Sequence, residues 1–209
     1  MTITSPSAAS FARWYPRLMN ISERAGQDHL RRDLLRRAHG RTLEVGAGNG
    51  FSMPHYPEDL DELVLVEPNP ALRTRLAARV DRPAAPVRIL DGDAHALDFP
   101  DNSFDTVTAS LVFCSLPHPT RALAELHRVL RPGGVFLFHE HVRATGTLGR
   151  CQDLITPLQR RIADGCHANR DFHSLLVASD FEIVELHHTR MPRAVPVIAP
   201  LVTGVARRG

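Results

Sequence analysis

The sequence predicts an α/β fold with a mostly parallel sheet. From residue 42 onward, short apolar runs alternate with helical stretches, which is the pattern of a parallel sheet covered by helices on both faces. The chain has 209 residues and a hydrophobic content of 43%. That length suits one well-buried domain and is short for two. We therefore expect a single α/β domain.

The elements follow from hydrophobic periodicity. Residues 11–38 carry apolar side chains at the spacing of one helix, or of two helices separated at Gly26. Five strands with helices between them come next, then a mostly helical insertion and two further strands, with Asp180 in a loop before the first of these. The expected strands are residues 42–45, 63–66, 87–90, 104–109, 135–138, 181–187 and 197–206, and the expected helices between them are residues 70–80, 119–130, 148–163 and 169–178.

Charge excludes some classes of partner and chemistry. The 25 basic and 23 acidic residues nearly cancel, so the whole chain is not drawn to nucleic acid or to an anionic membrane. Every basic residue is an arginine, which excludes Schiff-base chemistry through a lysine. Seven arginines fall in the first helical segment, where we interpret them as a solvated helix face: Arg13, Arg17, Arg24, Arg31, Arg32, Arg36 and Arg37.

The cysteines and the apolar runs indicate in which cellular compartment the protein is expected and whether it spans a membrane. Three cysteines at irregular spacing support neither a disulfide framework nor a zinc site, and they fit a reducing cytoplasm: Cys114, Cys151 and Cys166. The first ten residues lack the pattern of a signal peptide. The longest apolar run, residues 194–206, is broken by two prolines and is shorter than the ~20 residues of a spanning helix. We expect a soluble cytoplasmic protein, monomeric or homodimeric, without stable membrane insertion.

A glycine-rich loop follows the first expected strand, in the sequence LEVGAGNG at residues 43–50. Glycine lets the backbone turn with unusual dihedrals and lets a ligand approach closely. A dinucleotide fingerprint needs a third glycine where this chain has Phe51, and the lysine of a phosphate-binding loop is absent. The loop therefore does not suit a phosphate group.

Glu67 ends the second expected strand, 21 residues after Gly46. A carboxylate at this place can accept hydrogen bonds from both hydroxyls of a ribose. The two features together predict a ligand with a ribose and without a phosphate. S-adenosylmethionine meets that description.

Four segments, in order and spacing, resemble the successive motifs of class I S-adenosylmethionine-dependent methyltransferases with a type 11 methyltransferase domain. They are LEVGAGNG, VLVEPNP, GDAHALDFPDNSFDTVTASLVFCSL and ELHRVLRPGGVFLFHEH. The resemblance implies a Rossmann-like seven-stranded sheet with one antiparallel strand, an N-terminal helical cap (residues 1–38), a cofactor-binding core (residues 40–142) and an acceptor-side region (residues 143–209). It implies S-adenosyl-L-methionine as cofactor and S-adenosyl-L-homocysteine as product.

The same resemblance assigns cofactor contacts at the carboxyl ends of the first four strands, where open α/β sheets bind ligands. They are Glu44 near the amino group, Gly46, Ala47 and Gly48 beneath the methionyl part, Glu67 at the ribose, Pro68 and Asn69 along the adenine edge, Asp93 and Ala94 at the adenine amine and ring, and Ser110 and Leu111 near the transferred methyl.

The acceptor is expected to be a small molecule. The residues after the fourth strand read ASLVFCSLP instead of the Pro-Pro-aromatic motif that serves exocyclic amines of bases, and no basic tail is present, so a nucleic acid is disfavoured. The segments EHV, ITPLQRR, DGC and TGVA resemble a narrower group that includes mammalian alkyl-thiol S-methyltransferases. That resemblance implies a small, apolar thiol. The membrane-associating apolar segment that begins members of that group has no counterpart in the polar first residues here.

A thiol has a pKa near ~8.5 and needs only modest help from a base. The candidate bases at the end of the fifth strand are His139, Glu140 and His141, with the two histidines on one face and the glutamate on the other. This alternation is poor for holding one ion, so we expect no metal. The segment ADGCHANR, at residues 163–170, falls where the acceptor pocket is expected, and we assign its Asp164, Cys166 and Arg170 to substrate binding.

Two alternatives stay open. A methyltransferase acting on an oxygen, nitrogen or carbon of a small metabolite would require a histidine or glutamate base. A binding module could keep the cofactor and lack turnover.

Overall fold

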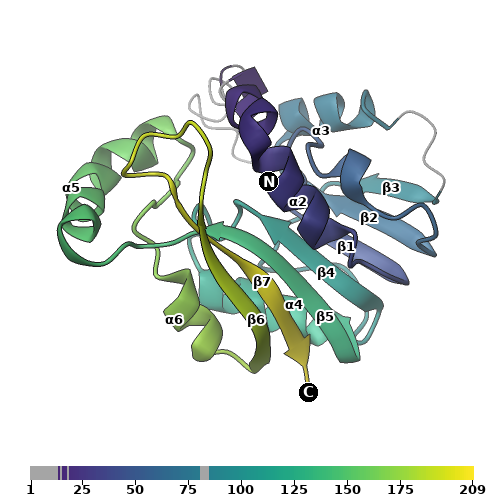
Figure 1. Ribbon diagram of the computed structural model, residues 1–209. Helices are drawn as coiled ribbons and strands as arrows, with labels where there is room; N and C mark the ends of the chain where they lie inside the picture. Colours follow the sequence, from purple (N-terminus) through teal and green to yellow (C-terminus); the bar gives the residue numbers. More distant parts are fainter. Residues whose placement is uncertain (1–13, 15, 18, 81–84) are drawn as a thin grey trace.

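The computed structural model describes residues 14, 16–17, 19–80 and 85–209 (Figure 1). Seven strands form one sheet in the order β3-β2-β1-β4-β5-β7-β6. They are β1 (Arg41–Val45), β2 (Glu62–Val66), β3 (Val87–Leu90), β4 (Phe104–Ser110), β5 (Leu130–His141), β6 (Phe181–Arg190) and β7 (Pro200–Arg208). The pairs among β1 to β5 are parallel, whereas β7 is antiparallel to β5 and to β6. The predicted sheet and its one antiparallel strand are confirmed.

The helices lie between the strands as predicted, with shifted ends. They are η1 (Glu23–Gln27), α2 (Asp28–Leu35), η2 (Met53–His55), α3 (Pro70–Ala77), α4 (Pro119–Val129), α5 (Gly146–Ile162) and α6 (Phe172–Val177). Side-chain caps fix two of the starts, because Asn69 accepts from the Ala71 amide and Asp171 accepts from the Ser174 amide. The first helical segment breaks at Gly26, whose φ is 117°.

Alternating side chains of the strands build a core on each face of the sheet. In β2, Val64 and Val66 pack in one core with residues of α4 and α6, while Leu63 and Leu65 pack in the other with residues of α2 and α3. Figure 1 shows these helix pairs on opposite faces, and it shows α5 apart from the sheet, at the left of the view. Within the described residues, no helix has both the length and the apolar character needed to cross a membrane.

The expected start of the last strand at residue 197 is wrong, because β7 begins at Pro200. The preceding residues turn back on themselves: the Ile198 and Ala199 amides both donate to the Val195 carbonyl, at 3.0 and 3.1 Å. Apolar composition suggested a strand here, but these residues form a loop that lines a cavity described below. The expected fifth strand was too short, since β5 runs on to His141.

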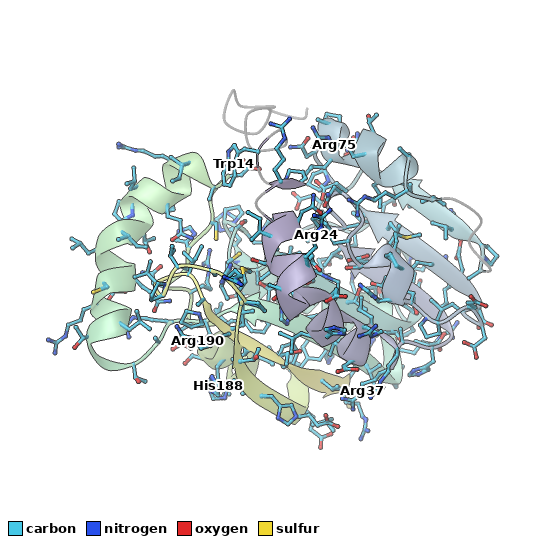
Figure 2. All side chains as sticks on the ribbon, turned by 45° about the horizontal axis from the view of Figure 1, so that its top comes forward. Trp14, Arg24, Arg37, Arg75, His188 and Arg190 are labelled. Atoms are coloured by element: carbon cyan, nitrogen blue, oxygen red, sulfur yellow. The ribbon has the colours of Figure 1, made fainter. Side chains whose placement is uncertain are left out.

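The arginines of the first helical segment divide into two kinds. Five are exposed, as a solvated face requires, and Figure 2 labels two of them, Arg24 and Arg37. The five are Arg17, Arg24, Arg32, Arg36 and Arg37. The same prediction is wrong for Arg31, which is 4% exposed and pairs with buried Glu23 at 2.8 Å. The other terminal nitrogen of its guanidinium donates to the hydroxyl of Ser110, at the end of β4, at 2.5 Å. Three parts of the predictions lie outside the described residues: Arg13, Leu18 and the first ten residues, for which no signal peptide was expected.

Candidate active site

The glycine loop after β1 turns where only glycine fits comfortably. Gly46 and Gly48 have φ of 64° and 57°, in the left-handed region that side chains rarely adopt. A Cβ on Gly46 would also lie 2.6 Å from a methyl of Val112. The Ala47 amide donates to the Val66 carbonyl at 3.1 Å, which ties the loop to the end of β2.

Glu67 is fixed beside this loop. Its two carboxylate oxygens accept from the Gly48 and Asn69 amides, both at 2.8 Å, and the residue is 5% exposed. Burial raises the pKa of Glu67, and the two amide bonds oppose that rise. The carboxylate is therefore held in one position by backbone groups, which leaves its remaining lone pairs for a ligand.

A cavity of about 260 Å³ lies over the carboxyl ends of β1, β2 and β4, and we call it the polar cavity. Eight of the eleven predicted cofactor residues line it: Gly46, Gly48, Glu67, Pro68, Asp93, Ala94, Ser110 and Leu111. Asp164, which the sequence assigned to the substrate, lines the same cavity. The structure therefore brings most of the predicted cofactor residues to one place.

The other three predicted cofactor residues lie around the polar cavity. Ala47 is buried in the core, and Asn69 caps α3. Glu44 is 2% exposed, and burial raises its pKa to about 7 against a hydrogen bond from Ser52 and the charge of Arg31. One of its carboxylate oxygens has no hydrogen-bond partner among the described residues. A buried carboxylate with a free oxygen fits a cationic amino group.

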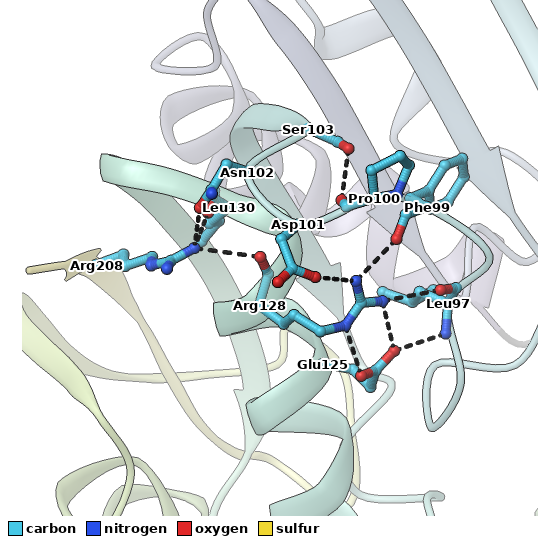
Figure 3. A network of polar contacts seen from close by, with 10 residues as sticks. All are labelled: Leu97, Phe99, Pro100, Asp101, Asn102, Ser103, Glu125, Arg128, Leu130 and Arg208. Atoms are coloured by element: carbon cyan, nitrogen blue, oxygen red, sulfur yellow. Dashed lines mark hydrogen bonds and ion pairs between the residues drawn. The ribbon is translucent and has the colours of Figure 1, made fainter.

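Arg128, at the end of α4, holds the loop that begins with Asp93 and Ala94 through hydrogen bonds to its later residues (Figure 3). Its guanidinium donates to the Leu97 and Phe99 carbonyls at 2.9 and 2.8 Å, and it pairs with Glu125. Burial tends to raise the pKa of Asp93, but hydrogen bonds from His95 outweigh it and the pKa is lowered. Asp93 is therefore held as an anion at the cavity edge.

A second cavity, of about 300 Å³, adjoins the first, and we call it the apolar cavity. Five segments far apart in the chain form it: the first helical segment, the loop after β4, the end of β5, the end of α5 with the residues that follow it, and the loop between β6 and β7. Its walls include Met19, Ile21, Leu111, Cys114, Ser115, His141, Ala163, Cys166, Met191, Val195 and Ile198. Leu111 and Ser115 line both cavities.

Leu111 sits at the junction with a strained backbone. Its φ is 60°, which is unusual for a bulky residue, and such strain gathers at functional sites. Two hydrogen bonds hold it there, from its own amide to the His139 carbonyl at 2.8 Å and from the Val112 amide to Glu140 at 2.8 Å. The end of β5 thus fixes the wall between the two cavities.

The three candidate bases have different surroundings. Only His141 lines the apolar cavity, and burial lowers its pKa to about 4, against hydrogen bonds with backbone groups of Pro200 and Ile198. His139 is fully buried, with its Nε2 2.7 Å from Gln27 Nε2, and burial lowers its pKa to about 3. Burial raises the pKa of Glu140 to about 7, and its carboxylate holds the loop after β4. Of the three, His141 alone faces the apolar cavity.

The predicted substrate residues also separate. Cys166 lines the apolar cavity together with Cys114. The two thiols are close enough to hydrogen-bond, which lowers the pKa of Cys166 and raises the pKa of Cys114. Arg170 lines neither cavity; it donates to the Leu116 carbonyl at 2.8 Å and fastens the loop after β4.

Sequence reasoning did not assign the rest of the apolar cavity. Cys114 and Ser115 could have been found, because they follow a strand at the edge of the sheet where ligands bind. Gln159, Met191, residues 193–195 and Ile198 carried no such signal, since they reach the cavity only through the packing of α5 and the β6–β7 loop. Among the residues that the structure describes, no three His, Cys, Asp or Glu side chains are arranged to hold a metal ion.

The strand order, the antiparallel seventh strand, the glycine loop and the acid after β2 together define the class I methyltransferase fold. Residues 43–138 match the family described as methyltransferase domain. Thiol S-methyltransferase TMT1A of Homo sapiens is 31% identical over 169 residues, which is 78% of this chain and 69% of that protein. The chain belongs to the S-adenosylmethionine-dependent methyltransferases and is an enzyme of this class. Family and fold imply S-adenosylmethionine as its methyl donor.

One further relative supports the same family, and one solved structure shows the same fold. Phosphatidylethanolamine N-methyltransferase of Cereibacter sphaeroides is 31% identical over 149 residues, covering 70% of this chain and 72% of that protein. A solved structure of an S-adenosylmethionine-dependent methyltransferase from Mesorhizobium loti superposes with a TM-score of 0.64 at 21% identity, over 88% of this chain and 98% of the other. At that identity, the structural likeness shows the fold alone.

Proposed function

We propose that this enzyme methylates the sulfur of a small, apolar thiol. The observation that carries the proposal is the pair of adjoining cavities: a polar one that gathers the cofactor residues, and an apolar one that meets it at Leu111 and Ser115. The name of the human relative, a thiol S-methyltransferase, supports this choice of acceptor.

In this proposal the polar cavity binds S-adenosylmethionine, which supplies an electrophilic methyl group. Glu67 accepts hydrogen bonds from the ribose hydroxyls, Asp93 accepts one from the adenine amine, and Glu44 faces the amino group. Alignment and exclusion of water are the main tasks of such a site, because the transfer is an in-line displacement. The acceptor thiol loses its proton to His141 or to solvent water, and its sulfur forms a bond to the methyl carbon as the donor sulfonium bond breaks, which leaves a thioether and S-adenosylhomocysteine.

We also propose that the chain divides by task. Residues 1–38 cap the site, residues 40–142 bind the cofactor, and residues 143–209 shape the acceptor side. The contact from Arg31 to Ser110 supports the first assignment, because it reaches from the first helical segment to the wall of the polar cavity.

Of the three candidate bases, only His141 faces the apolar cavity, and its basicity favours a thiol over a phenol. His141 has a pKa of about 4, so it is neutral at pH 7 but is a weak base. A phenol, with a pKa near ~10, would need a stronger base, whereas a few per cent of a thiol is already thiolate at neutral pH. The apolar walls match an alkyl chain.

His141→Ala should lower kcat/KM for a thiol by about tenfold at pH 6.5 and by less than about threefold at pH 9.5. Above pH 4 the histidine stays neutral, so the change with pH comes from the acceptor, which no longer needs a base once it is ionised. Initial rates across this range test it, with the exposed His188→Ala as control. A deficit that is equal at both pH values would contradict the assigned role.

An acceptor panel tests the proposed function. Aliphatic thiols, aromatic thiols, phenols and amines are compared through the release of S-adenosylhomocysteine, and turnover of the aliphatic thiols is expected to be fastest. The bacterial relative that is a phosphatidylethanolamine N-methyltransferase makes amine methylation the second candidate. Turnover of amines or phenols without turnover of thiols would sink the thiol proposal. Tight cofactor binding with no product on any acceptor would indicate a binding module.

A further inference from the structure

Helix α5 has its polar side turned inward. The side chains that it buries are polar or absent, at Gly149, Gln152 and Thr156. Its outer side carries Leu154, Leu158 and Ile162, which are 82%, 63% and 58% exposed. Helices at the surface of globular proteins normally turn their apolar side to the core. The helix stands at the edge of the molecule in Figure 1, and the exposed fractions show that this apolar stripe faces solvent.

The two buried polar side chains of α5, Gln152 and Thr156, are hydrogen-bonded. Gln152 accepts from the Ala144 amide at 2.7 Å and donates to the Ala168 and Val142 carbonyls at 2.9 and 3.3 Å. Thr156 donates to the Gln152 carbonyl at 2.7 Å. These buried bonds fix the rotation of the helix. The exposure of its leucines is therefore built into the fold.

The apolar stripe lies beside the opening of the apolar cavity. Gln159 and Ala163, next in sequence to Leu158 and Ile162, line that cavity. Ile21 and Val195 also line it, and they are 56% and 58% exposed. Exposed apolar side chains from two segments thus line the cavity, and the stripe of α5 is next in sequence to two further lining residues.

The charges around the stripe are positive. Arg150 and Arg161 are exposed and, at four residues before Leu154 and three after Leu158, lie on the same side of α5. Neither makes an ion pair with another described residue. The only acid of α5, Asp153, is paired with Arg143 at 2.7 Å. Arginine can lay its aliphatic part along apolar surface and keep its charge in water.

We propose that the outer side of α5 docks on an anionic lipid surface, so that the apolar cavity opens toward the lipid. Leucines flanked by arginines match the apolar and anionic layers of such a surface. A second copy of this chain fits less well, because a two-fold contact would bring the same positive face against itself. The docking itself is independent of the proposed function. A docked enzyme could take a lipophilic acceptor directly from the lipid, and this second step rests on the proposed function.

Flotation with lipid vesicles tests the docking. Wild-type protein is expected to float with vesicles of phosphatidylcholine and phosphatidylglycerol, and much less with phosphatidylcholine alone. Leu154→Glu/Leu158→Glu should reduce the bound fraction by roughly tenfold, because the change removes two apolar anchors and adds repulsion. The matched control is Val184→Glu, a partly exposed valine on the edge strand β6, which should bind as wild type does. Both variants should keep turnover of a water-soluble thiol.

Several results would overturn the docking proposal. One is a wild-type protein that binds neither kind of vesicle. Another is equal binding to neutral and anionic vesicles, and a third is a double variant whose bound fraction equals that of the wild type. A wild-type dimer that the double variant converts to a monomer, measured by light scattering, would assign the stripe to a second copy instead. Vesicle binding without thiol turnover would leave the docking intact and would refute only the proposed acceptor.

Discussion

Glu67→Ala is expected to weaken the binding of S-adenosylmethionine by roughly 30- to 150-fold, which corresponds to about 2–3 kcal/mol. The carboxylate is buried, held by the Gly48 and Asn69 amides, and lines the polar cavity. Its loss leaves the two amides without their partner and, under the proposed assignment, removes the acceptor for both ribose hydroxyls. Isothermal titration with the cofactor measures the change.

The control for this variant lies in the same strand. Glu62, at the start of β2, forms an ion pair with Arg41 at 2.7 Å and does not line the polar cavity. Glu62→Ala should therefore leave cofactor affinity unchanged, and Glu67→Gln should fall between the two, since an amide oxygen still accepts one bond. Full affinity in a folded Glu67→Ala protein would contradict the ribose assignment.

Arg31→Met is expected to lower the free energy of unfolding by about 3–5 kcal/mol. The ion pair of Arg31 with Glu23 is almost fully buried, with 5% and 9% of the side chains exposed. Removing the guanidinium leaves a buried carboxylate without its partner and deprives Ser110 of a donor at the wall of the polar cavity. Chemical denaturation measures the loss.

Two variants separate this effect from a general loss of charge. Arg31→Met/Glu23→Leu removes both partners and should recover most of the stability, because no unpaired charge remains. Arg36→Met, on the same helix, removes an exposed arginine whose distance to Asp33 is 3.6 Å, and it should change stability by less than about 0.5 kcal/mol. If Arg31→Met costs no more than Arg36→Met, the buried pair does not stabilise the cap.

The sheet and the main residues of the polar cavity could be predicted because their signals are local. A strand buried on both faces reads as a short apolar run, as in residues 63–66, and the glycine loop and Glu67 each follow such a run directly. Their meeting at one edge then follows from the topology, since parallel strands end at the same side of the sheet.

The acceptor side could not be predicted as well, because it depends on packing between distant segments. The burial of Arg31 depends on Glu23 and on Ser110, which is 79 residues away. The alternation of β5 placed the histidines correctly on one face, but which of them reaches the cavity depends on Gln27, which covers His139. The orientation of α5, with its apolar stripe toward solvent, likewise depends on two carbonyls outside the helix that accept hydrogen bonds from Gln152.

Methyl transfer is proposed to occur where the polar and apolar cavities meet, at Leu111 and Ser115. A crystal structure with S-adenosylhomocysteine and an alkyl methyl thioether, the two expected products, tests it most directly. We predict that the ribose hydroxyls bind Glu67 and that the thioether lies in the apolar cavity, with its methyl group directed at the homocysteine sulfur past Leu111. A thioether bound outside that cavity, or a nucleoside away from Glu67, would contradict the claim.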